Sequence, residues 1–241
     1  SADRSPFFIS RMLDLAIRLI GDFFGVIKKM MVMSDGQEHT RRRRTAACGF
    51  DSSLLKSYQT LIDETVDNLI KNAQPKGYIE FVEDIAQQLP SIILADLFNI
   101  NGDDRHNFYD WSNNMTQFFG GASDYQNEDG IRVNKSAVAI REFFTTLMHQ
   151  RRKNPQGDFL SVLIQNQERF QLSDEEVVSQ AIMMLVAGQI TTTDQMCNNL
   201  FSMLNERNHL EAIKQNPDLL ETALEEFNRL DPAVTFLFRV A

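Results

Sequence analysis

Residues 173–205 read SDEEVVSQAIMMLVAGQITTTDQMCNNLFSMLN, and they carry the clearest structural signal in the chain. Ser173 is followed by three acids, and Glu176 stands at the position from which a side chain reaches back to close a capping box. Residues 181–186 are apolar on every face, which is typical of a helix that crosses the middle of a core. The pattern predicts one long central helix over residues 174–205.

Residues 187–193 break the pattern in the middle of this helix. They hold a glycine, which costs about 1 kcal/mol relative to alanine in a helix interior, and three threonines. Hydroxyls of Thr191 and Thr192 can bond the carbonyls of Ala187 and Gly188, which bends a helix. Ala187 and Thr191 share one face, so we expect a groove of small residues with one hydroxyl. The groove suits a flat ligand; a Gly–Thr kink for tight helix packing is the alternative.

The rest of the chain is also predicted to be mainly helical. It has 6 prolines and 11 glycines in 241 residues, and apolar residues recur at three- and four-residue spacing. Further helices are predicted over residues 10–24, 39–48, 52–72, 82–98, 103–119, 134–152, 157–168, 208–214 and 217–230. The best strand signals are Tyr78 to Val82 and Val234 to Val240, and residues 120–130 are predicted to form a loop.

Composition narrows the class of protein. With 24 Lys+Arg against 33 Asp+Glu, the net charge is −9, which argues against a nucleic-acid binder. Cys48 and Cys197 are too few for a disulfide framework and indicate a reducing compartment. No uncharged apolar stretch reaches the roughly 18 residues of a membrane span, and the N-terminus lacks the design of a signal peptide. We therefore expect a soluble, cytoplasmic protein.

Residues 187–192, AGQITT, resemble the Ala-Gly-x-acid-Thr-Thr stretch of the cytochrome P450 family. The resemblance implies that Thr191 and Thr192 are catalytic, with Thr191 above a haem iron, where it would position dioxygen. It also implies that Ala187 and Gly188 lie against the cofactor. The order and spacing of further motifs agree with the family over almost the whole chain. The fold implied is a mainly α, cytochrome P450-like helical core around a long central helix, with little β structure.

Residues 35–44, DGQEHTRRRR, resemble the family segment that enters its third helix. The resemblance implies that His39 and Arg43 bind a haem propionate. The residues themselves agree, because two donors four positions apart share a helix face and suit a carboxylate. A solvated basic helix start is the alternative.

Residues 225–232 resemble the family's Glu-x-x-Arg helix, which implies that Glu226 and Arg229 form a buried structural ion pair. At this spacing an exposed helix pair is the alternative. Arg239, in a segment resembling the following strand, is implied to meet the other propionate.

Two departures from the family pattern stand out. Ile190 occupies the place of the usual acid, which helps deliver protons to oxygen. The family's axial cysteine lies in a loop downstream of Ala241, and neither Cys48 nor Cys197 has that context, so both are expected to be buried thiols. We therefore expect residues 1–241 to be a single partial P450-like domain, from the third-helix region through the Glu-x-x-Arg helix.

The resemblance implies a haem-thiolate monooxygenase acting on an apolar or biosynthetic small molecule, with haem as cofactor and a ferredoxin-type redox partner. The alternative is a haem-free P450-derived protein that binds a small molecule or partner, or catalyses a non-redox rearrangement. If the shortened chain is natural, an oligomer is expected, because apolar faces would be left uncovered. A metal site at Asp103, Asp104 and Asp110 is not favoured, because acids at a helix start suit the helix dipole.

Overall fold

The computed structural model describes residues 20–50, 52–119 and 128–236. Within these ranges the chain is helical, without strands, and residues 20–27 form a first helix. The other α-helices are α2 (Gly36–Ala47), α3 (Ser52–Ala73), α4 (Gln88–Leu97), α5 (Phe108–Phe119), α6 (Glu128–Lys153), α7 (Phe159–Asn166), α8 (Asp174–Asn205), α9 (Arg207–Gln215) and α10 (Leu220–Leu230). Short 3-10 helices are η1 (Met31–Met33), η2 (Gln74–Lys76), η4 (Gly102–Asn107) and η5 (Pro217–Leu219), and η3 (Phe81–Ala86) is a π-helix.

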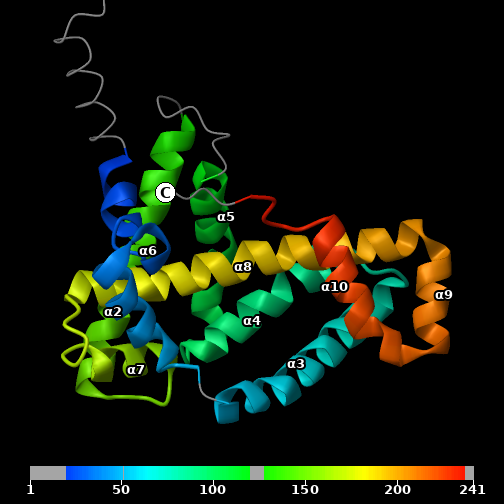
Figure 1. Ribbon diagram of the computed structural model, residues 1–241, viewed down its shortest axis with the longest axis horizontal. Helices are drawn as coiled ribbons and strands as arrows, with labels where there is room; N and C mark the ends of the chain where they lie inside the picture. The colour runs from blue at the N-terminus through cyan, green and yellow to red at the C-terminus, as the bar shows by residue number, and fades with distance from the viewer. Residues whose placement is uncertain (1–19, 51, 120–127, 237–241) are drawn as a thin grey trace, which may run out of the picture.

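Helix α8 is the axis of the molecule (Figure 1). Helices α5, α6 and α7 pack around its N-terminal half, α4 and η3 run along its middle, and α10 lies across its C-terminal part. Ala181, Ile182 and Leu185 are fully buried among these neighbours. The predicted central helix is confirmed, with both of its bounds. Its capping box is formed as predicted, because Ser173 and Glu176 exchange side-chain to backbone hydrogen bonds.

The hydrophobic core lies around the N-terminal half of α8 and is rich in phenylalanine. Phe98 contacts Phe144 edge to face at 4.9 Å between ring centroids and Phe159 at 5.8 Å, which joins the end of α4 to α6 and α7. All three rings are at most 2% exposed. Full burial of such a side chain stabilises the fold by about 1.5–3 kcal/mol, so this cluster anchors the three helices firmly.

The other predicted helices form, with shifted bounds. The helix expected over 82–98 is split into η3 and α4, and the one expected over 103–119 begins as η4. The helix expected over 134–152 begins earlier, at Glu128, so the end of the expected loop is helical; residues 120–127 lie outside the described residues. Most of the helix expected over 10–24 also lies outside them.

The described residues contain no strand, and they test one of the two strand expectations in full. The expected strand Tyr78 to Val82 is wrong, because residues 78–80 have no regular structure and η3 begins at Phe81. Residues 234–236 are not a strand, and the rest of the expected strand Val234 to Val240 lies outside the described residues. A strand needs a partner for its backbone groups, and the described part of the chain supplies none here. No helix in the described ranges is both long and apolar enough to cross a membrane.

Candidate functional site

A narrow exposed face of small residues interrupts the buried part of α8. Val186 and Ile190 are each 7% exposed, whereas Ala187 and Thr192 are exposed and Thr191 is half-buried. The Thr191 hydroxyl donates to the carbonyl of Ala187 at 2.5 Å, as predicted from the sequence. Ala187 and Thr191 therefore form the expected surface of a methyl group and one hydroxyl, which a flat molecule can approach closely.

Gly188 faces a different neighbour. A Cβ atom added to it would lie 3.1 Å from Cδ2 of Leu94, which belongs to α4. This is closer than ordinary van der Waals contact, so the missing side chain lets α4 approach α8. The geometry supports the packing alternative for Gly188, and its implied contact with a cofactor stays a prediction.

Gln189 fixes the rotation of α8 at the site, a role that was not predicted from the sequence. Its side chain is fully buried, and its carbonyl lies 2.9 Å from the hydroxyl of Ser91. Its amide donates to the carbonyl of Gln87 at 3.1 Å, at the junction of η3 and α4. Thr193 adds a bond from its hydroxyl to the carbonyl of Ala86 at 2.9 Å. These bonds turn the opposite face, with Ala187 and Thr191, outward. The sequence signal for this role was a glutamine that directly follows an apolar run in the helix.

His39 and Arg43 lie on α2, four residues apart. His39 is half-buried and Arg43 is exposed. Neither side chain forms a hydrogen bond or ion pair with any residue in the described ranges. A guanidinium has a fork of donors that suits a carboxylate, and the implied binding of a propionate by His39 and Arg43 stays a prediction.

The two preceding arginines have another role. Arg42 is buried, and its Nε donates to Oε1 of Glu176 on α8 at 2.9 Å. Arg41 forms an ion pair with the same carboxylate. Burial alone raises the pKa of the Glu176 carboxyl. The hydrogen bond from the Ser173 amide and the two guanidinium groups outweigh burial and lower this pKa to about 2. Glu176 is thus a buried carboxylate that links α2 to α8. Its position in the capping box did not predict this second role.

The expected burial of Glu226 and Arg229 is wrong for the described structure. The pair forms on α10, with two hydrogen bonds of 2.8 and 2.6 Å, but its side chains are 52% and 66% exposed. The reason is that no described element packs over this face of α10, where only Phe227 is buried. Arg239 lies outside the described residues.

The two cysteines differ in surroundings. Cys48, at the end of α2, is exposed, so its expected burial is wrong; its thiol contacts the carbonyl of Arg44 at 3.3 Å. Cys197 on α8 is half-buried, and burial, with the nearby Asp194 carboxylate, raises the pKa of its thiol. In the described part of the chain, no three His, Cys, Asp or Glu side chains gather as metal ligands.

The family model for cytochrome P450 matches residues 23–225. The biotin biosynthesis cytochrome P450 of Bacillus subtilis (strain 168) is 30% identical over 227 residues, which cover 91% of this chain and 55% of that protein. A steroid C26-monooxygenase of Mycobacterium tuberculosis (strain CDC 1551 / Oshkosh) is 28% identical over 213 residues, which cover 88% of this chain and 56% of that protein.

A solved structure gives the same result. The crystal structure of P450BioI in complex with an acyl carrier protein carrying hexadec-9Z-enoic acid superimposes with a TM-score of 0.78 at 28% identity, covering 86% of this chain and 53% of that one. The chain spans about half the length of the curated relatives it matches. Its sequence motifs, its helical architecture and the family model agree, and the chain therefore belongs to the cytochrome P450 family.

Proposed function

We propose that this chain forms the oxygen-facing half of the haem pocket of a P450 monooxygenase that acts on an apolar or biosynthetic small molecule. The observation that carries the proposal is the outward face of α8 at Ala187 and Thr191. This face is small and holds one hydroxyl, and Gln189 fixes its orientation from the buried side of the helix.

The residues present fit haem in two respects. A flat macrocycle needs a helix face without bulky side chains, and Ala187 provides one. The propionates need cationic donors, and the exposed Arg43 side chain on α2, four residues after His39, can supply one. We assign one propionate to His39 and Arg43, and the other to Arg239. When bound, haem with a cysteine thiolate supplies the oxidative chemistry of the family.

Thr191 is the chain's own proton-handling group in this proposal. Its hydroxyl now donates to the carbonyl of Ala187. Rotation about the Cα–Cβ bond would redirect the hydroxyl from the helix carbonyl toward a ligand on the exposed face. Thr192 is the next residue of α8 and is exposed. We assign it a supporting role in the same site.

Ile190 favours a second candidate function. It stands where the family has an acid, and an isoleucine side chain has no carboxylate to carry protons. The side chain is also buried. A haem-free protein that binds a small molecule or catalyses a non-redox rearrangement would not need that carboxylate.

Partners follow from the first proposal. The protein would bind an apolar small molecule and accept electrons from a ferredoxin-type protein. The complex of P450BioI with an acyl carrier protein extends the substrate candidates to carrier-bound acyl chains.

Haem titration tests the proposal. The protein titrated, called the full polypeptide below, contains residues 1–241 together with the family's axial-cysteine loop. We expect uptake of haem and a low-spin to high-spin absorption shift on addition of an apolar substrate. Arg43→Ala should weaken haem retention at least about tenfold, because it removes a charge-assisted hydrogen bond worth about 1.5–3 kcal/mol. The matched control is Arg44→Ala, because Arg44 is the next residue of α2 and is also exposed. Failure of the full polypeptide to take up haem would overturn the proposal and favour the haem-free candidate.

A further inference from the structure

Two side chains at the start of α8 hold the segment that leads into α2. Glu176 and Gln180 are one helical turn apart and share a face of α8. They are 6% and 0% exposed. We call this pair the α8 clamp.

Glu176 binds the middle of α2. Its carboxylate accepts from Arg42 Nε at 2.9 Å and from Arg41 Nη1 at 3.1 Å. Arg41 Nη1 also donates to the carbonyl of Gln171 at 2.6 Å, just before α8. A carboxylate shared by two guanidinium groups restricts both the distance and the rotation of α2, because each fork of donors has a fixed geometry.

Gln180 binds the chain just before α2. Its amide donates to the carbonyl of Lys29 at 2.7 Å, and its carbonyl accepts from the backbone N–H of Met31 at 2.9 Å. These backbone groups lie where residues 28–31 leave the first helix and enter η1, so they lack regular helical partners. Buried backbone groups need partners, and Gln180 supplies them from α8.

The clamp faces neither His39 nor Arg43, but it determines where they lie. Successive helical residues are about 100° apart, so His39 and Arg43 occupy a face of α2 about 60–100° from that of Arg42. Glu176 lies eleven residues before Ala187, which corresponds to about 16 Å along α8. Because α8 is one continuous helix, fixing α2 on its first turns also fixes α2 relative to the exposed face of Ala187.

We propose that Glu176 and Gln180 are positioning residues that set α2 on α8, and thereby place His39 and Arg43 at the right distance from Ala187 and Thr191. This inference rests on the proposed function, and it adds a role for residues that contact no ligand.

A distance measurement tests the clamp without haem. Spin labels would be placed on Cys48, at the end of α2, and at position 204 through Leu204→Cys, with Cys197→Ser in all proteins. Glu176→Gln keeps the shape of the side chain but removes its charge, so we expect a broader or shifted distribution of label distances. Asp174→Asn is the matched control, since Asp174 lies in the same helical turn but pairs with Arg152 of α6 rather than with α2 or the segment before it. If Glu176→Gln does not fold, Arg41→Gln removes one of the two guanidinium contacts and should give the same change to a smaller degree.

A double-mutant cycle tests the link to the site. In the full polypeptide, Glu176→Gln should increase haem dissociation at least about tenfold, measured by transfer to excess apomyoglobin. Combined with Arg43→Ala, it should add little, because the clamp acts through the donors of α2. A general loss of stability would instead add fully to Arg43→Ala.

The outcomes separate the two proposals. An unchanged distance distribution, or full additivity with Arg43→Ala, would overturn the positioning role while the proposed function stands. Failure of the wild type to take up haem would overturn the proposed function, and the distance distribution would then decide alone whether Glu176 sets α2 on α8.

Discussion

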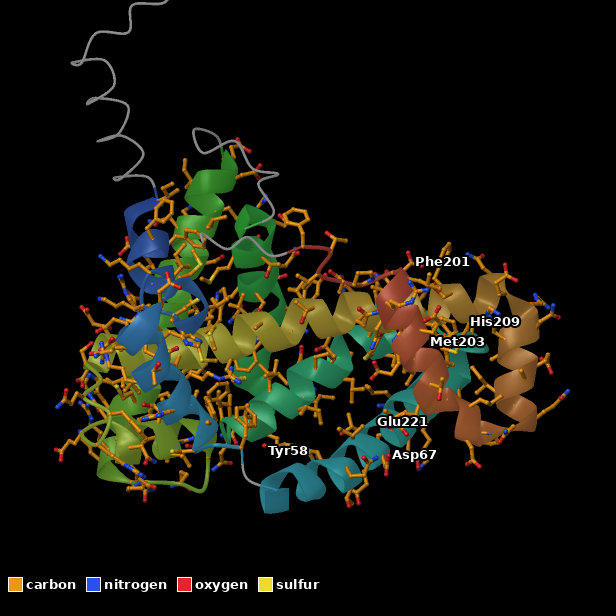
Figure 2. The ribbon with its side chains drawn as sticks, in the orientation of Figure 1. Tyr58, Asp67, Phe201, Met203, His209 and Glu221 are labelled. Carbon is orange, nitrogen blue, oxygen red and sulfur yellow. The ribbon has the colours of Figure 1, made fainter. Side chains whose placement is uncertain are left out.

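The two halves of α8 have very different surroundings. Between Glu176 and Thr193 most residues are buried, whereas from Asp194 to Asn205 none is. Figure 2 labels Phe201 and Met203 near the C-terminal end of α8. Phe201 is 66% exposed. The candidate site at Ala187 and Thr191 therefore lies where a rigid, buried helix gives way to an exposed one.

Different forces hold the two halves. The first half is held by apolar burial, the α8 clamp and the bonds of Gln189. The second half packs only against partly exposed elements such as α10, and polar contacts tie it to the chain after α10: Gln195 accepts from the N–H of Ala233 at 2.8 Å, and Asn198 donates to the carbonyl of Asp231 at 3.1 Å. Polar contacts near solvent stabilise less than apolar burial does, so the second half should open more readily.

The largest expected difference comes from the same substitution in each half. Leu185 is fully buried and Leu204 is 54% exposed. Leu185→Ala should lower the free energy of unfolding by about 2–5 kcal/mol, because it removes burial and leaves a cavity. Leu204→Ala should change it by about 0.5 kcal/mol or less. Urea unfolding followed by circular dichroism measures both, and equal effects would show that the two halves are packed alike.

The second expected difference is in how strongly each half of α8 makes the stability of the fold depend on acidic pH. Glu176 in the first half has a pKa lowered from 4.5 to about 2. Its ionised form therefore stabilises the fold fully above the unfolded pKa near 4.5, and this contribution is lost as the pH falls toward about 2. The shift corresponds to about 3 kcal/mol, since one pKa unit is about 1.4 kcal/mol.

Unfolding between pH 7 and pH 2 tests this assignment. Glu176→Gln should lower stability at pH 7 and flatten its fall below pH 5. The exposed pair of Glu226 and Arg229 provides the contrast, because Glu226→Gln should leave the profile close to that of the wild type. A steep acid dependence that survives Glu176→Gln would assign the acid response to other carboxylates, such as Asp174, whose pKa Arg152 lowers to about 2.

The sequence predicted what depends on local geometry. The bounds of α8, its capping box and the bond from Thr191 to Ala187 all follow from residues three or four positions apart, and all are confirmed. The break at Gly188 was also identified, but its cause was not. That cause is Leu94, which is distant in the sequence.

Long-range partners explain the rest. Nothing near Glu176 in the sequence points to Arg41 and Arg42, and nothing near Gln189 points to Ser91. The strand expected at Tyr78 to Val82 failed for a related reason, because its β-branched and aromatic residues have no neighbouring strand in the described structure and η3 forms instead. Burial of Glu226 and Arg229 likewise depends on what covers α10, which local spacing does not encode.

The smallest expected difference concerns two glutamines on α8. Gln189 is fully buried, whereas Gln195 is half-buried. Gln189→Ala should lower the free energy of unfolding by about 1–3 kcal/mol, because the carbonyl of Gln87 and the hydroxyl of Ser91 lose a buried partner. Gln195→Ala should lower it by about 1 kcal/mol or less, because water can replace the lost bonds at a half-exposed site. Hydrogen exchange of the amides around Thr191 separates the two further: Gln189→Ala should accelerate it and Gln195→Ala should not. Faster exchange at Thr191 in both variants would mean that the exposed half of α8, as well as the buried half, fixes the site.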